Sequence, residues 1–230
     1  MSDPREQACP VDLPPFMQPL ARQARSGRDV LLDRGVHPPR PEDPPYRRSA
    51  VLLLITGSEL DTAQVLLHER GHALRSQPGQ IALPGGGVED QDADEIATAL
   101  RESREEVDLN PTDVSVLGTF APVPMPHRHL AITPVLAWAA EPPAVRVRDR
   151  LEVERVLWTP LEGPDGLAAP QRRARGLLDG RPVGPLFDLP DNVLVWGFTA
   201  MLLDRVLTQL GAAPVPPHTV PAREIPPRLR

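Results

Sequence analysis

Three glutamates on one turn of a predicted helix are the residues of this sequence that most strongly suggest chemistry. Glu102, Glu105 and Glu106 belong to a run that begins with Arg101, fifteen residues after Gly86. At about 100° of rotation per residue, their side chains fall within about 100° of arc on one helix face. Like charges at this spacing repel each other, whereas a bound Mg²⁺ or Mn²⁺ takes oxygen ligands and makes the crowding favourable. The three glutamates therefore predict a divalent-metal site.

Two neighbouring features are expected to position these carboxylates. The opposite side of the helix carries the three- and four-residue spacing of a helix packed on a sheet, in Ile96, Ala99, Leu100, Ser103 and Val107. Before the helix, Gly85-Gly86-Gly87 can bring backbone groups close to a phosphate or a metal, because no side chain stands in the way. An acidic helix face alone is usually only solvated, and a glycine run alone is usually a turn. Their order and spacing together favour the metal site.

This stretch resembles the signature of the Nudix hydrolases, G-x5-E-x7-R-E-U-x-E-E-x-G-U, in which U is apolar. Arg101 and the helix glutamates match it, but Asp92 stands where Glu is usual, and eight residues instead of seven lead on to Arg101. Ser103 takes an apolar position, and Asp108 replaces a glycine. These departures concern the geometry of the loop more than metal binding. The resemblance implies an α+β fold, an α/β/α sandwich with a mixed β-sheet between helices, and a metal-dependent hydrolase.

A narrower resemblance, from about residue 50 to residue 211, is to the coenzyme A diphosphatase branch of that family. The segments that carry it are Leu66-Leu67-His68-Glu69-Arg70, then Arg75-x3-Gly79-x3-Leu83-Pro84-Gly85-Gly86, and further on Thr133–Leu136 and Val195–Ala200. Leu83 departs from the phenylalanine expected there. The resemblance implies hydrolysis of coenzyme A or acyl-CoA to 3′,5′-ADP and the corresponding 4′-phosphopantetheine. It also implies Arg70, Arg75, Gly85 and Gly86 as substrate contacts.

The expected roles follow from charge. A metal on Glu102 and Glu106 would neutralise diphosphate oxygens and activate a water, and Glu105 either completes its shell or pairs with Arg101 four residues earlier. The general base is a helix glutamate or Glu152, which lies where relatives often supply a further acidic ligand. Glu154 competes for that role. His127 and His129 lack a third nearby ligand and are expected on a loop surface or at the substrate.

The choice of substrate stays open at this point. ADP-ribose, a dinucleotide or a nucleoside triphosphate would use the same phosphate chemistry, since one fold supports many activities. A ligand-sensing module without turnover is a further alternative. The intact Arg101 and its glutamates argue against it, because a module without a metal has no physical reason to keep mutually repelling charges.

Composition excludes several other classes of protein. All 25 basic residues are arginine, which removes the lysine required by a P-loop or a Schiff-base enzyme. The net charge of −6 argues against nonspecific binding of nucleic acid. Cys9 is the only cysteine, so no disulfide and no thiolate zinc site is expected. With neither a leader nor an apolar run of membrane length in the sequence, a cytoplasmic protein without a membrane partner is expected, and a homodimer is possible.

The order of local patterns predicts one domain at 46–211, between a loosely ordered proline- and arginine-rich arm at 1–45, with at most one helix, and a disordered proline-rich tail at 212–230. Predicted strands are Val51–Thr56, Ala63–His68, Gly79–Leu83, Val114–Phe120, Leu130–Ala139 and the end of Leu151–Trp158. Arg173–Leu178 and Val183–Phe187 are expected to form a hairpin around Asp179-Gly180. Predicted helices are Asp94–Val107, a short one at Thr159–Leu167, and Asn192–Leu210 with Asp191 as its cap.

Overall fold

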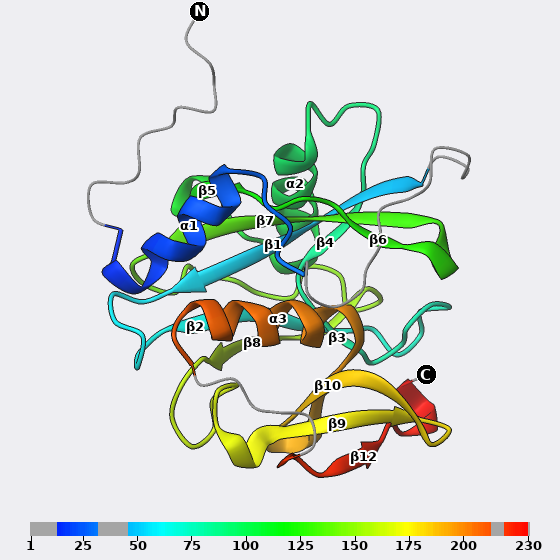
Figure 1. Cartoon of the computed structure of the whole chain (residues 1–230). Coiled ribbons are helices and arrows are strands. Elements are labelled where there is room, and N and C mark those ends of the chain that lie inside the picture. Colours follow the sequence, from blue (N-terminus) through cyan, green and yellow to red (C-terminus); the bar gives the residue numbers. More distant parts are fainter. Residues whose placement is uncertain (1–12, 32–45, 213–218, 230) are drawn as a thin grey trace, which may run out of the picture.

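A mixed β-sheet between helices forms the body of the protein (Figure 1). The computed structural model describes residues 13–31, 46–212 and 219–229. The main sheet has the order β3-β2-β1-β7-β5, with β4 paired to β1, β6 to β7 and β8 to β2. Its strands are β1 (Arg47–Thr56), β2 (Gln64–Arg70), β3 (Ile81–Ala82), β4 (Gly85–Gly87), β5 (Ser115–Thr119), β6 (Val123–Met125), β7 (Leu130–Ala139) and β8 (Val153–Pro160).

A second, smaller sheet lies beside the first, as the lower part of Figure 1 shows. It has the order β11-β10-β9-β12 and consists of β9 (Arg173–Leu178), β10 (Arg181–Leu189), β11 (Val193–Val195) and β12 (Ala222–Glu224). The helices are α1 (Gln18–Arg25), α2 (Glu95–Val107) and α3 (Gly197–Gln209). Together these elements confirm the predicted α+β sandwich.

The central strands β1 and β7 carry apolar side chains on both faces of the sheet, so both faces must be covered. They pair in parallel along their whole length, from Arg47 beside Leu130 to Thr56 beside Ala139. Strands buried on both faces have continuous apolar sequences instead of an alternating pattern. In β1, Leu52 and Leu54 pack on the side of α2, whereas Leu53 and Ile55 pack on the opposite side with α1 and α3.

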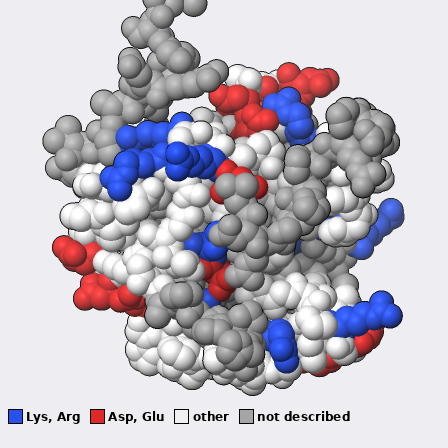
Figure 2. All heavy atoms as spheres, viewed as in Figure 1, with Lys and Arg blue, Asp and Glu red and all other residues white. Residues whose placement is uncertain are grey.

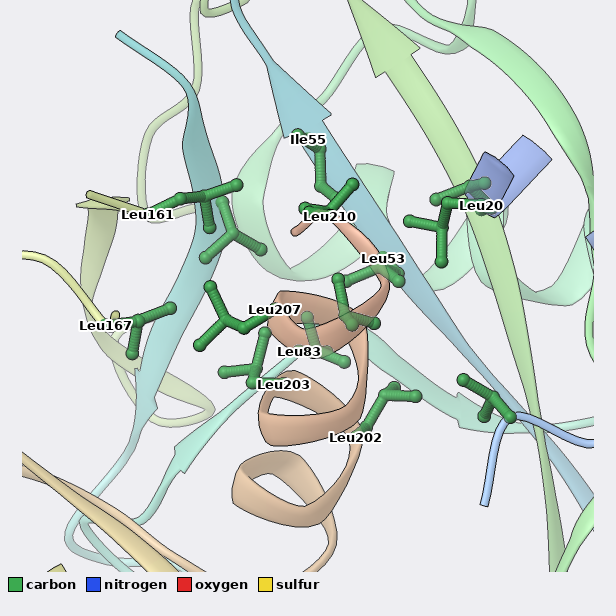
Figure 3. Packing of buried hydrophobic residues seen from close by; sticks show 14 of the residues in the cluster. Leu20, Leu53, Ile55, Leu83, Leu161, Leu167, Leu202, Leu203, Leu207 and Leu210 are labelled. Carbon is green, nitrogen blue, oxygen red and sulfur yellow. The ribbon is translucent and has the colours of Figure 1, made fainter. Parts of the chain in front are cut away.

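Leucines of α3 fill much of the core on the face opposite α2. Figure 3 shows Leu203 and Leu207 of α3 together with Leu53 of β1 and Leu83. Leu83 is 3% exposed, so the residue that departs from the coenzyme A diphosphatase motif is a core residue. On the other face, the predicted apolar stripe of α2 is confirmed, because Ala99 and Val107 are fully buried and Ile96 and Leu100 pack against the same cluster.

Two helix predictions near the second sheet are wrong. Thr159–Leu167 forms no helix, because β8 continues to Pro160 against β2. The last helix begins at Gly197 instead of Asn192, and its cap is Trp196 without a side-chain hydrogen bond. Asp191 and Asn192 both have a φ of 58°, which is the left-handed region and cannot continue a right-handed helix. The apolar residues Val193–Val195, two of which are β-branched, pair with β10 as β11 instead.

The described part of the N-terminal segment is more ordered than the expected arm. Met17, Leu20 and Ala24 are almost completely buried in the same cluster as α3, and Leu31 is fully buried there. The opposite side of α1 is polar, and Figure 2 shows blue arginine atoms gathered over this helix. The prediction of a loose arm is therefore wrong for residues 13–31. Residues 1–12 and 32–45 lie outside the described residues.

The described part of the C-terminal segment is also ordered. The expected tail without regular structure is contradicted by β12, whose residues Ala222–Glu224 pair in parallel with β9. Its prolines flank this three-residue strand at the edge of the sheet, where a missing N–H is tolerated. Ile225 then packs in a fully buried position with Ala174, Leu186 and Leu194. Further along, the Leu229 carbonyl accepts a hydrogen bond from the buried Gln80 side chain at 2.9 Å.

In the described segments of the chain, no helix is long and apolar enough to span a membrane.

Replacing Ile225 with alanine tests whether the C-terminal segment is part of the core. We expect Ile225→Ala to lower the free energy of unfolding by about 2–4 kcal/mol, because it leaves a cavity in a packed cluster. Leu151→Ala is the matched control, since Leu151 is 68% exposed and its loss should cost less than about 0.5 kcal/mol. Urea denaturation of both variants measures the difference. Equal midpoints would show that the segment does not contribute to the folded core.

Candidate metal centre

The glycine run lies directly against the central strand β1. Gly85 and Gly86 pair antiparallel with Val51 and Ala50. A Cβ atom on Gly85 would lie 2.3 Å from the Ala50 carbonyl oxygen, so only glycine fits there. The Gly86 carbonyl accepts a hydrogen bond from the Ser49 hydroxyl at 2.5 Å. These contacts fix the position of the Gly85 and Gly86 backbone, which the glutamates of α2 face.

Helix α2 begins and ends at residues suited to its termini. The Asp94 side chain accepts a hydrogen bond from the Ala97 N–H at 2.8 Å and caps the first turn. Asp108 ends the helix in the left-handed conformation, with a φ of 54°, which aspartate tolerates better than most residues. The helix is therefore fixed in register over the glycine run.

Glu106 is the most buried of the three glutamates. Its side chain is 8% exposed, and its Oε2 accepts a hydrogen bond from the Gly85 N–H at 2.9 Å. Burial, together with the charges of Glu102 and Glu152, raises the pKa of Glu106 to about 8 against the lowering effect of the Gly85 hydrogen bond and of Arg70. Three acidic side chains therefore act on one another at this point.

Glu102 lies over the glycine run. A Cβ atom on Gly86 would come within 2.3 Å of Glu102 Oε1, so the carboxylate occupies the space that the missing side chain leaves. Burial raises the pKa of Glu102, against the opposing effect of Arg101. Glu105 differs, because its side chain is 51% exposed and pairs with Arg101 Nη1 at 3.0 Å. Of the two roles expected for Glu105, this structure contains the ion pair.

Arg101 organises the acidic side chains around it. Its Nε and Nη2 atoms contact the two carboxylate oxygens of Asp92 at 3.0 Å each, and Nη2 also donates to the Gly87 carbonyl. Its Nη1 contacts Glu102 and Glu105, both at 3.0 Å. The hydrogen bonds from Arg101 hold the pKa of Asp92 well below its usual range, and the same pair raises the pKa of Arg101. The guanidinium thus ties the loop before α2 to the helix.

Glu152 approaches the site through a close contact between two backbone segments. The Gly71 N–H donates to the Glu152 carbonyl at 2.8 Å, and a Cβ atom on Gly71 would lie 2.2 Å from the Leu151 carbonyl oxygen. The pairing of β8 with β2 is irregular at this point. Arg70 pairs with Val153, whereas its neighbour Glu69 pairs with Arg155. Glu154 is therefore the extra residue of a bulge and has no partner on β2. Of these two candidates, Glu152 is the one whose charge raises the pKa of Glu106 together with burial.

The basic residues expected at the substrate lie in different settings. Arg70 is half-buried, its charge acts on Glu106, and its Nε atom is buried without a hydrogen-bond partner in the described residues. Arg75 is exposed on the loop between β2 and β3. That loop is closed at its base, where the Gly79 N–H donates to the Arg70 carbonyl at 3.0 Å. Arg128, near the same loop, contacts the Ser76 hydroxyl at 3.3 Å.

Comparison with known proteins identifies the family. The family model of the NUDIX domain matches residues 45–176, which is more than half of the chain. The chain belongs to the Nudix hydrolase family.

The chain is 32% identical over 179 residues to an uncharacterized Nudix hydrolase, NudL, of Photorhabdus laumondii, covering 75% of this chain and 90% of that protein. It is 33% identical over 182 residues to the uncharacterized Nudix hydrolase NudL of Escherichia coli K12, covering 74% and 85%. A solved Nudix hydrolase from Nitrosomonas europaea is 14% identical, with a TM-score of 0.48, and covers 80% of this chain and 82% of that one.

The departures from the Nudix signature each have a local explanation. The Asp92–Arg101 pair forms although Asp92 is shorter than glutamate and the loop has an extra residue. Ser103 is buried at an apolar position, and its hydroxyl donates to the Ala99 carbonyl at 2.7 Å, so it leaves no unsatisfied polar group. Asp108 takes the left-handed conformation that the usual glycine adopts easily. The Nudix scaffold of α2 is therefore intact.

The donor set fits a divalent cation of the kind that Nudix hydrolases generally use. Carboxylate oxygens are the ligands that Mg²⁺ and Mn²⁺ prefer, and Glu102 and Glu106 are both held in positions where burial opposes their charge. A cation removes that cost. In the conformation of residues 13–31, 46–212 and 219–229, no three His, Asp, Glu or Cys side chains already stand in a metal-binding array. Arg101 instead compensates part of the negative charge.

The raised pKa of Glu106 predicts how stability depends on pH. An unfolded glutamate ionises near 4.5, whereas Glu106 keeps its proton up to about 8, so the folded metal-free protein binds more protons between these values. The contribution of Glu106 to the free energy of unfolding therefore falls as pH rises from 5 to 8. Burial lowers the pKa of His68 from 6.5 to about 3, which gives a slope of opposite sign below 6.5, so the net fall in stability is expected between pH 6.5 and 8. We expect Glu106→Gln to remove this slope and to be more stable than the original chain by an amount on the order of a few kcal/mol at pH 8.

Urea denaturation with EDTA at several values of pH measures this effect. Glu105→Gln is the matched control, because its side chain is half exposed, and it should keep the slope of the original chain. Parallel pH profiles for Glu106→Gln and the original chain would contradict the assignment of a strongly buried, proton-binding carboxyl.

Proposed function

We propose that this Nudix hydrolase uses Mg²⁺ or Mn²⁺ to cleave the diphosphate bond of coenzyme A or acyl-CoA, giving 3′,5′-ADP and the corresponding 4′-phosphopantetheine. The observation that carries the proposal is the pair formed by half-buried Glu102 and buried Glu106 at the glycine run, with the charge of Glu152 acting on Glu106. A pair of this kind is costly without a cation and suited to one that also binds phosphate oxygens.

The same place offers groups for the diphosphate itself. Arg70 is half-buried, and its Nε atom lacks an acceptor in the described residues, while a guanidinium is well matched to the planar pairs of oxygens on phosphate. Gly87 exposes backbone that an oxygen anion can approach, because a Cβ on it would meet nothing within 4 Å. Arg70 is therefore proposed to hold a diphosphate oxygen beside Glu106.

The remaining chemistry requires a water and a base. A bound divalent ion supplies charge neutralisation and lowers the pKa of a coordinated water. In this reaction the protein contributes positioning and electrostatic stabilisation, and no covalent nucleophile is required. Glu152 is the proposed acceptor of the proton from the attacking water, since it lies near enough to Glu106 to raise its pKa. Arg101 holds Glu102 in place and is proposed to act through that contact.

The specific choice of coenzyme A rests on the motif between β2 and the glycine run. Arg75 is exposed on the loop of that motif, and its side chain forms no hydrogen bond or ion pair with the described residues, so it is available to a further phosphate. Coenzyme A carries a 3′-phosphate that ADP-ribose lacks. The alternatives are another nucleoside diphosphate derivative, such as ADP-ribose, and a sensing module without turnover, against which the costly burial of Glu106 argues.

Replacing each of the two candidate residues by glutamine tests which one is the general base. We expect Glu152→Gln to lower kcat by roughly 100-fold or more, which is the usual loss when a base is removed. Glu154→Gln is the matched control, because the residue is exposed two positions away, and it should stay close to the original rate. Steady-state assays with coenzyme A and Mg²⁺ measure both variants. A large loss in Glu154→Gln together with an active Glu152→Gln would reverse the assignment.

Substrate preference is tested with a panel of diphosphates at equal concentration, read by chromatography of the products. We expect higher kcat/KM for coenzyme A than for ADP-ribose, dinucleotides or nucleoside triphosphates. Arg75→Ala should raise KM for coenzyme A about tenfold, the equivalent of one charged contact, with little change in kcat. Arg22→Ala, an exposed arginine on α1, is the control and should leave KM unchanged. Strong turnover of ADP-ribose alone would overturn the choice of coenzyme A.

A further inference from the structure

His68 on β2 is fully buried, and its ring makes no hydrogen bond to the described residues. Its relative exposure is 0%, and neither Nδ1 nor Nε2 has a hydrogen-bond partner in the described residues. Each buried polar atom left in this state costs on the order of 1–3 kcal/mol. A neutral leucine of similar size would fill the space without that cost. Packing alone therefore gives no reason for a histidine at this position.

The surroundings of His68 are apolar except on one side. Val156 is its partner on β8, and the adjacent positions on the same face, Leu66 and Trp158, belong to the cluster that α2 covers. On the remaining side, Nε2 lies 3.8 Å from Glu106 Oε1. Burial lowers the pKa of the ring, and the positive charge of Arg70, two residues along the strand, lowers it further.

The two oxygens of Glu106 are held unequally. Oε2 accepts a hydrogen bond from the Gly85 N–H, whereas Oε1 faces His68 at a distance that is about 0.8 Å too long for a hydrogen bond. Contacts in functional sites are often long in the free protein and shorten in the bound state. A small rotation of the carboxylate brings Oε1 within reach of the ring.

We propose that His68 is a positioning residue, which donates its Nε2–H to Glu106 Oε1 when Glu106 is ionised and holds a divalent cation. The inference rests on the metal dependence proposed above. Donors on both oxygens, Gly85 and His68, then fix the plane of the carboxylate and leave its remaining lone pairs for the cation. An imidazole ring can present an N–H at Nε2 whether it is neutral or protonated. Partners of this kind typically change metal affinity by about 10–100-fold.

Binding of Mn²⁺ to the whole chain without substrate is the direct test. Titration of Mn²⁺, followed by the electron paramagnetic resonance signal of the free ion, gives the dissociation constant. We expect His68→Leu to weaken Mn²⁺ binding by about 10–100-fold. The metal-free melting temperature of this variant should be equal to or higher than that of the original chain, because the unsatisfied ring is gone.

Two amide variants separate positioning from packing. The Gln side chain places its amide near the position of Nε2, so His68→Gln should bind Mn²⁺ almost as the original chain does. The Asn side chain is too short to reach Glu106, so His68→Asn should bind as weakly as His68→Leu. This pair also decides the question if His68→Leu does not fold. Equal affinities for the Gln and Asn variants would overturn the proposal, as would an unchanged affinity in a folded His68→Leu.

Glu106→Gln in the same titration distinguishes this inference from the proposed function. If Glu106→Gln loses Mn²⁺ binding while His68→Leu retains it, the metal site stands and the role of His68 is wrong. If the original chain itself does not bind Mn²⁺, both are wrong. A His68→Leu protein that loses affinity and melting temperature together, without recovery in His68→Gln, would show a purely structural role and would also overturn the inference.

Discussion

The buried contact between Glu106 and the Gly85 N–H is the interaction on which the rest of the site depends. It joins the last turn of α2 to the strand that pairs with β1. It requires glycine at Gly85, where a Cβ would clash with the backbone of β1, and the Glu102 carboxylate occupies the space beside Gly86. A carboxyl group in this position has its charge opposed by burial and by Glu102. The packing that makes the helix stable therefore also creates a demand for positive charge.

Arg101 determines how three glutamates of similar spacing come to have different roles. Its guanidinium is held in a fixed orientation by Asp92, and its Nη1 contacts both Glu102 and Glu105. Glu105 remains half exposed beside it, whereas Glu102 lies over Gly86. Arg101 thus compensates the negative charge of Glu102 and Glu105, whereas Glu106 receives the hydrogen bond from Gly85 and the more distant charge of Arg70.

Periodicity predicted the elements that position the site, and tertiary contacts decided what it missed. The 3.6-residue stripe of α2 and the apolar run of β7 are strong local patterns, and their predicted ranges agree closely with the structure, whereas the predicted β1 lacks its first four, less apolar residues. His68 looked like one residue of a motif, because burial without a partner cannot be read from neighbours in sequence. The left-handed Asp191 and Asn192 resemble a helix cap in sequence, and the strand in the proline-rich segment exists only because β9 offers it an edge.

The segments at both ends of the described chain contribute to the order of the region that carries the motifs. Residues 13–31 add their apolar side chains to the cluster that includes Leu83, directly before the glycine run. From the other end, the Leu229 carbonyl accepts a hydrogen bond from Gln80, whose own carbonyl accepts one from the Arg70 N–H at 2.9 Å. The loop that carries Arg75 is therefore closed at a base that the C-terminal segment helps to hold. The C-terminal segment is therefore linked to the acidic pair, because two hydrogen bonds join Leu229 to Gln80 and Gln80 to Arg70, and the charge of Arg70 acts on Glu106.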